Sequence, residues 1–140
     1  MLAKFQIYLP VLLISLGLFA LGCGKKEAPT AKVSFAEPKD GATIKGPVKV
    51  VMVVEGMKIQ PAGEVVEGTG HHHILINKDF FPPGQVIPTD DTHRHFGKGD
   101  TEAVLDLPPG DYKLTLQFAD GLHRSYGKDS SATVNIKVVP

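Results

Sequence analysis

The chain has 140 residues, of which 42% are hydrophobic and 21% are charged, a size and composition that suit one globular domain. Fifteen Lys and Arg residues balance fifteen Asp and Glu residues, so the formal charge is zero. No basic stripe is present for binding nucleic acid, and we therefore expect no nucleic-acid partner.

The first segment has the pattern of a lipoprotein signal peptide. A short basic start, Met1 to Lys4, precedes an apolar run over residues 5–21. On length alone this run would also span a bilayer, which takes about 20 apolar residues. It ends in Ala20-Leu21-Gly22-Cys23, however, where small residues surround a cysteine as a cleavage site requires. These four residues resemble a bacterial lipobox, and we predict a signal peptide over residues 1–22.

Cys23 is the only cysteine, so no intramolecular disulfide can form. The lipobox resemblance implies that Cys23 is the acylated N-terminus, and the alternative is an ordinary secreted protein with a chance cysteine. Gly24 follows it, which by the same resemblance does not signal inner-membrane retention. We expect lipid anchoring at the periplasmic face of the outer membrane of a Gram-negative bacterium. The polar residues 23–31 predict a tether, and residues 32–140 the folded domain.

The folded domain is predicted to be all-β. Eleven prolines and fifteen glycines indicate many turns, and no stretch keeps a helical period over three turns. The stretch 47–55 is apolar on both faces, which predicts a central, well-covered strand. About seven short strands favour an antiparallel β-sandwich of the immunoglobulin type. They are expected near residues 32–36, 47–55, 70–77, 92–96, 101–107, 111–118 and 132–139.

Half of the six histidines open the strand expected at 70–77. Side chains alternate along a strand, so His71 and His73 share one face with Leu75, and His72 lies on the other. Two histidines two residues apart can reach one ion, and neutral imidazole is the commonest protein ligand for zinc and copper. The alternative interpretation is that one of the three is buried and hydrogen-bonded while the others are exposed.

The strand order of such a sandwich gathers the remaining histidines at the same end. His93 and His95 lie in the strand expected at 92–96, and His123 lies in the loop after 111–118. Because 92–96 is assigned to the second sheet, the cluster should bridge the two sheets at their rim. The alternative is a histidine hydrogen-bond network that stiffens this rim. The predicted metal ligands are His71, His72, His73, His93, His95 and His123, with Asp90 and Asp120 as supporting carboxylates.

Copper or zinc fits this donor set best, because the ligands on offer are imidazoles. Met52 and Met57 are expected near the same end, where a thioether would favour copper. No nucleophile elbow, phosphate loop or HExxH helix occurs, so no catalytic residue is predicted.

Five ordered motifs resemble a bacterial secreted family described only as a domain of unknown function. They are Gly70–Ile76, Ile87–Asp90, His93–Glu102, Leu107–Gly110 and Asp120–His123. The resemblance implies a β-sandwich in the cell envelope and supplies no established activity. Relatives often carry a further histidine shortly after the position of His123, where this chain has Arg124-Ser125-Tyr126. Residues 93–97 also resemble copper–zinc superoxide dismutases locally, with a spacing that differs by one residue.

These observations favour a lipid-anchored module that captures or chaperones a divalent metal, copper or zinc, rather than an enzyme. The main alternative is a structural or protein-interaction domain of the envelope that binds no metal. A redox metalloenzyme is the weaker alternative. The expected partners are a metal ion and, through the lipid, the membrane, whereas the sequence specifies no protein partner.

Overall fold

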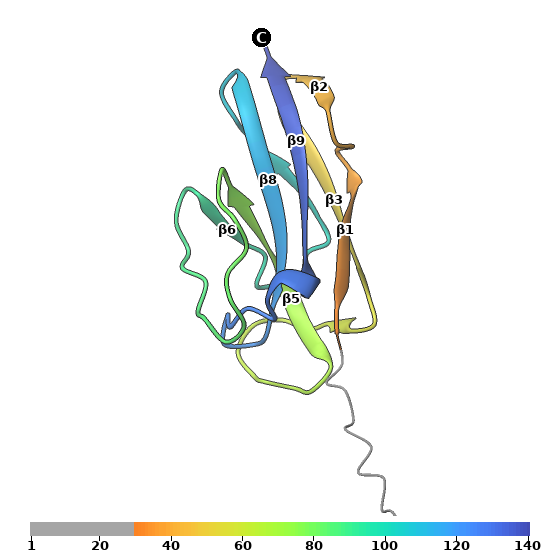
Figure 1. Cartoon of the computed structure of the whole chain (residues 1–140), viewed down its shortest axis with the longest axis vertical. Coiled ribbons are helices and arrows are strands. Elements are labelled where there is room, and N and C mark those ends of the chain that lie inside the picture. Colours follow the sequence, from red (N-terminus) through yellow and green to blue (C-terminus); the bar gives the residue numbers. More distant parts are fainter. Residues whose placement is uncertain (1–29) are drawn as a thin grey trace, which may run out of the picture.

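The computed structural model describes residues 30–140 as two β-sheets and one short 3-10 helix, with no α-helix in that range. The three-stranded sheet has the order β1-β3-β7 and comprises β1 (Lys32–Glu37), β3 (Val48–Glu55) and β7 (Glu102–Leu105). The six-stranded sheet has the order β2-β9-β8-β5-β4, with β6 also paired to β5 (Figure 1). It comprises β2 (Ala42–Lys45), β4 (Lys58–Ile59), β5 (Thr69–Ile76), β6 (His93–His95), β8 (Gly110–Ala119) and β9 (Ser131–Val139), with helix η1 (Lys128–Ser130) before β9.

The predicted signal peptide over residues 1–22, the lipidation site Cys23 and most of the predicted tether lie outside the described residues. Ala31, expected as the last tether residue, is fully buried in the core. Within residues 30–140 no helix has the length and apolar character needed to span a membrane.

All seven predicted strands are present, and β2 and β4 are two short additions. The all-β class is therefore confirmed. The immunoglobulin type is not confirmed, because the larger sheet curls into a half-barrel. The strand predicted at 92–96 is β6, and it pairs with β5 in the larger sheet rather than lying in the second sheet.

The main hydrophobic core fills the space between the two sheets. Alternate residues of β3, among them Val48 and Val50, and of β8, among them Leu114 and Leu116, are fully buried there, as the apolar alternation predicts. The strand β3 is central in its sheet, but the expectation that both its faces are covered was wrong. Val53, which points away from the core, is 37% exposed.

The outer face of the larger sheet is covered by loops. Thr115 and Gln117 are polar and point away from the main core in the alternation of β8, yet both are buried. The Gln117 side chain accepts a hydrogen bond from Phe81 N (3.1 Å) and donates to Gly127 O (2.9 Å), so it fixes two covering loops onto β8. A second small apolar cluster of Leu75, Ile87 and Ala119 forms under these loops. A protected layer therefore exists on the outer side of β5.

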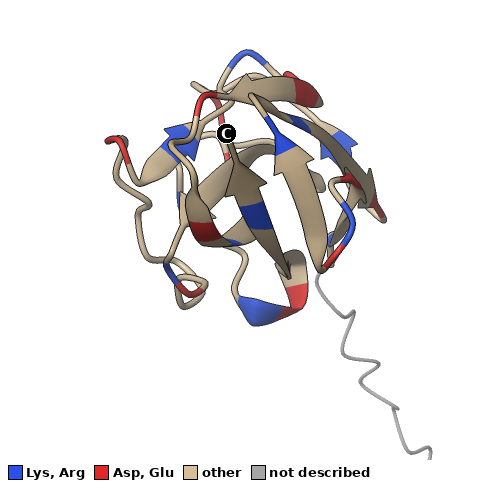
Figure 2. Cartoon of the chain, turned by 90° about the horizontal axis from the view of Figure 1, so that it is seen from above, with Lys and Arg blue, Asp and Glu red and all other residues tan. Residues whose placement is uncertain are grey.

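Acidic and basic residues are interspersed over the strands and loops, as Figure 2 shows from above. Few of them form short ion pairs. The pair Lys113 Nζ–Asp79 Oδ1 (2.7 Å) lies at the surface, and Arg124 Nε–Asp120 Oδ2 (2.7 Å) lies at the loop that carries His123.

Candidate metal centre

Strand β5 is buried along its whole length, so both of its faces are covered by other parts of the chain. His72, Ile74 and Ile76 face the main core, where the His72 ring packs edge-on against Phe118 (centroids 5.2 Å apart). His71 and His73 point the other way, into the layer beneath the loops. The predicted alternation of the three histidines is therefore correct, and it places two of them in a polar cluster and one in the core.

Strand β6 supplies the third histidine of the cluster. In the antiparallel register His95 is opposite His73 and His93 is opposite Leu75. Opposed residues point to the same face of a sheet, so the His95 ring comes beside His73, with centroids 5.0 Å apart. A Cβ at Gly97 would overlap the His95 ring, so the chain must have glycine there for His95 to take this position.

The loop after β8 supplies the fourth histidine. His123 has a φ of 63°, a left-handed conformation that is uncommon for a residue other than glycine. The Asp120 carboxylate holds this turn by accepting hydrogen bonds from Leu122 N (2.9 Å) and Arg124 N (3.0 Å). His123 Nδ1 consequently lies 3.2 Å from His71 Nε2. A strained backbone that brings a polar side chain to a cluster is typical of a functional site.

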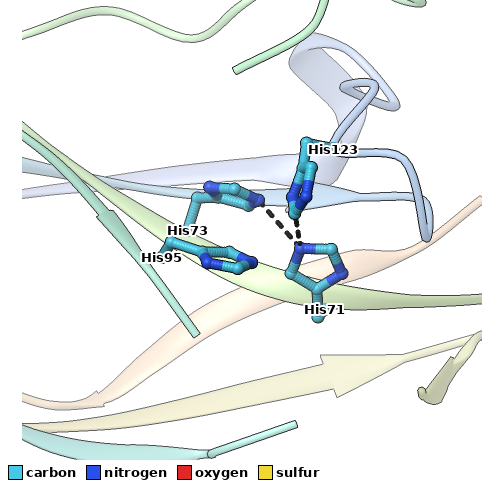
Figure 3. Close-up of side chains that lie close together, drawn as sticks. All are labelled: His71, His73, His95 and His123. Atoms are coloured by element: carbon cyan, nitrogen blue, oxygen red, sulfur yellow. Dashed lines mark hydrogen bonds between the residues drawn. The ribbon is translucent and has the colours of Figure 1, made fainter. Parts of the chain in front are cut away.

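The four rings converge on one point (Figure 3). One nitrogen from each of His71, His73, His95 and His123 can be chosen so that all four lie within 4.8 Å of one another. Two of the contacts are already short, because His73 Nε2 lies 3.0 Å from His71 Nε2 and His71 Nε2 lies 3.2 Å from His123 Nδ1. Nitrogen ligands of a tetrahedral zinc ion are about 3.3 Å apart, given Zn–N bonds of about 2.0–2.1 Å. The group can therefore hold a metal ion after small movements of the rings.

Burial favours the neutral form of three imidazoles of the site, those of His71, His73 and His95. Burial, with repulsion from His95 and His123, lowers the pKa of His71 to about 4. Burial and repulsion from the other histidines lower the pKa of His73 to about 2. Burial also lowers the pKa of His95, and repulsion from His123 lowers it further. Neutral imidazole is the form that binds a metal, so these shifts leave the donor nitrogens available at neutral pH.

Several ring nitrogens in this cluster are buried without a hydrogen-bond partner, namely His71 Nδ1, His73 Nδ1 and His95 Nε2. An unpaired buried polar atom costs about 1–3 kcal/mol, so a cluster of them indicates a site built for something other than stability. A cation bound by His95 Nε2 would give this nitrogen a partner and so remove the cost of leaving it unpaired.

The two predicted supporting carboxylates do not bond the ligand rings. Asp120 bonds the backbone of the His123 loop and the Arg124 guanidinium, so its support for His123 is indirect. Asp90 accepts hydrogen bonds from Thr92 and from His93 Nδ1 (2.9 Å), and these bonds lower the pKa of Asp90. It therefore orients His93 rather than a member of the cluster.

The expectation that all six histidines converge was wrong for two of them. His72 lies on the core face of β5 because side chains alternate, and neither of its ring nitrogens has a hydrogen-bond partner. His93 is opposite Leu75, two pairs away from His95 along β6, and packs on Phe81 beside Asp90. The described residues bring together only His71, His73, His95 and His123 as a candidate metal group.

The location of the cluster also differs from the prediction. It does not bridge the two sheets, because β5 and β6 belong to the same sheet and the cluster lies on that sheet's outer face. Met52 and Met57, predicted near the ligands, are instead buried in the core between the sheets. The argument that a thioether favours copper is therefore not supported.

A protein-family model matches most of the chain. The model described as a domain of unknown function, DUF4399, matches residues 50–139. The chain belongs to this family. The match spans β5, β6 and the loop after β8, and so contains all four histidines of the cluster.

Other comparisons add little about activity. No curated protein matches the chain. A solved structure of an endo-β-1,4-mannanase from Thermotoga petrophila is similar, with 23% sequence identity and a TM-score of 0.44. The similarity covers 78% of this chain but only 20% of that one.

Proposed function

We propose that this DUF4399 protein is a lipid-anchored module of the cell envelope that captures a divalent transition metal, copper or zinc, for storage or delivery. The observation that carries the proposal is the group of four histidines whose ligand nitrogens lie within 4.8 Å of one another. All four ligands are imidazoles, which suit both zinc and copper, and copper(II) binds such sites more tightly than zinc.

The proposed location rests on the sequence. The apolar run ending in Ala20-Leu21-Gly22-Cys23 supports a lipid anchor at Cys23, and Gly24 supports transfer to the outer membrane. Labelling cells with a fatty-acid analogue should mark the wild-type protein and miss the Cys23→Ala variant. Equal labelling of both proteins would contradict the lipid anchor without affecting the metal site.

The metal test is a calorimetric titration of the metal-free protein with zinc and with copper(II), together with the metal content of the freshly purified protein. We expect binding of at least one ion well below micromolar concentration. A dissociation constant weaker than about 10 μM for both ions, only ~7 kcal/mol of binding free energy, would refute the proposed function.

A second candidate is an envelope interaction domain that contains a metal-free histidine network. The hydrogen bonds between His73 and His71 (3.0 Å) and between His71 and His123 (3.2 Å) favour it, because they join the rings without an ion. The two candidates differ in one measurement: added zinc raises the melting temperature of a metal-binding protein by mass action and leaves that of a metal-free network unchanged.

A further inference from the structure

The four ligands of the candidate site differ in their access to solvent. His71 and His73 are fully buried, whereas His95 and His123 are half-buried. His95 and His123 are therefore the two ligands on the solvent side of the site. These two histidines also stand outside β5, so their positions depend on other chain segments.

One short segment joins the two chain segments that carry His95 and His123. We call residues 60–64, between β4 and β5, the strap. Ala62 N donates a hydrogen bond to Gly97 O (2.8 Å), two residues after His95, and Gly63 N donates to Gly121 O (2.9 Å), two residues before His123. Gln60 N donates to Gly70 O (2.8 Å), which fixes the start of the strap to β5. In Figure 1 the loop between β4 and β5 accordingly lies beside the loop that follows β8.

The strap packs so closely on the His123 loop that only glycine fits there. A Cβ at Gly121 would overlap the backbone carbonyl of Glu64. Gly121 is not among the glycines with positive φ, so the requirement is for space rather than for an unusual backbone conformation. Backbone atoms cannot move aside as the end of a flexible side chain can. A side chain at this position must therefore push the strap and the His123 loop apart.

We propose that the strap is a clasp that positions His95 and His123 for the ion, and that Gly121 is a positioning residue of the site. This inference rests on the proposed metal-binding function. The strap bonds both segments, so it fixes the distance between the two ligands that complete the site. By linkage, an ion that draws these ligands together also stabilises the docked strap, and undocking the strap weakens ion binding by the same factor.

The first test compares Gly121→Ala with Gly110→Ala in the full chain. Both variants add one methyl group, but a Cβ at Gly110 meets its nearest atom at 3.5 Å, an ordinary contact. We expect Gly121→Ala to weaken zinc binding about ten- to hundredfold, the usual effect of removing a residue that orients ligands, and Gly110→Ala to stay within about twofold. The visible spectrum of the cobalt(II)-loaded protein should change only in Gly121→Ala, because it reports the ligand arrangement rather than overall stability.

The second test needs no variant. Hydrogen exchange of the Ala62 and Gly63 amides is measured in the wild-type protein with and without zinc. We expect zinc to slow exchange at both amides by at least about tenfold, because a ligand that binds the closed form suppresses local opening. The Gly41 amide, which donates to Asn135 O (2.7 Å) at the opposite edge of the sheet, serves as the internal reference.

A zinc affinity of Gly121→Ala within about twofold of wild type would refute the proposal that the strap positions His95 and His123. So would unchanged exchange at Ala62 and Gly63 on adding zinc, and this measurement decides alone if Gly121→Ala does not fold. A wild-type protein that binds neither zinc nor copper would overturn both this inference and the proposed function. Tight zinc binding by wild type and Gly121→Ala alike would refute only the positioning role of the strap and leave the proposed function standing.

Discussion

His73 and His95 lie directly opposite each other on the antiparallel strands β5 and β6, with their ring centroids 5.0 Å apart. The pairing register alone thus brings a third histidine to the face that already holds His71 and His73. A shift of β6 by one residue would turn His95 to the other face and remove it from the cluster. The site depends on keeping a strand of only three residues in register.

The first prediction concerns shared ligation by His73 and His95. His73→Ala and His95→Ala should each weaken zinc binding strongly, and the double variant should lose far less than the sum of the two losses, since residues that bind one ion act as a unit. Calorimetric titration measures all three variants. His93→Gln is the control and should bind like wild type, because His93 bonds Asp90 rather than the cluster. Additive losses would mean that the two histidines do not share an ion.

The second prediction separates His72 from the metal site. His72 is fully buried against Phe118, and neither of its ring nitrogens has a hydrogen-bond partner. His72→Leu should stabilise the metal-free protein, on the order of 1–3 kcal/mol, because it removes two unpaired polar atoms at similar volume. Urea unfolding measures the stability, and zinc affinity should be unchanged. A large loss of affinity would return His72 to the ligand set.

The third prediction concerns the stability of the metal-free protein against pH. The pKa values of His71 and His72 fall to about 4 in the folded state, from 6.5 in the unfolded chain. As the pH drops below 6.5, the unfolded chain takes up protons that the folded protein excludes, so the free energy of unfolding decreases. Each such histidine contributes up to about 1.4 kcal/mol per pH unit between pH 6.5 and 4. Urea unfolding at several pH values should show this slope, and His71→Gln should reduce it. A flat profile would contradict the lowered pKa values.

The fourth prediction concerns metal binding against pH. Between pH 7 and 5.5, proton competition costs a free imidazole about eightfold in affinity, or several thousandfold for four ligands. His71 and His73, with pKa values of about 4 and about 2, contribute almost none of this loss. We therefore expect zinc affinity to fall by less than about a hundredfold over this range, as measured by competition with a chelator. A drop of several thousandfold would show that protons reach all four rings freely.

The fifth prediction tests the left-handed residue His123, whose φ is 63°. Asn tolerates this conformation better than most residues but cannot replace the imidazole ligand. His123→Asn should therefore keep the melting temperature of the metal-free protein and weaken zinc binding. His123→Ala should weaken binding similarly and also lower the melting temperature, because alanine is strained at positive φ. Equal melting temperatures for both variants would argue against strain at this position.

Part of the site follows from the sequence. The alternation of β5 predicts that His71 and His73 share a face with Leu75 and that His72 lies opposite, because side-chain direction in a strand depends only on spacing. The family motifs also give the segments that carry His95 and His123.

The pairing of β6 could not be predicted in the same way. Three residues, His93–His95, carry no apolar alternation that would indicate which sheet they join. The burial of Thr115 and Gln117 could not be predicted either, because covering loops, rather than a packed sheet, exclude water from them. The strap was missed for a related reason: its bonds to Gly97 and Gly121 are made by backbone atoms, which leave no residue-type pattern in the sequence.

The absence of a carboxylate among the four clustered side chains has an electrostatic consequence. Over residues 23–140 the chain has 14 Lys and Arg residues against 15 Asp and Glu residues, a side-chain charge of −1. Neutral imidazoles do not offset the charge of an ion, so a bound divalent cation would bring this total to +1. Loaded and unloaded molecules would then differ by two units of charge, and a charged surface or an ion-exchange column could tell them apart without contacting the histidines.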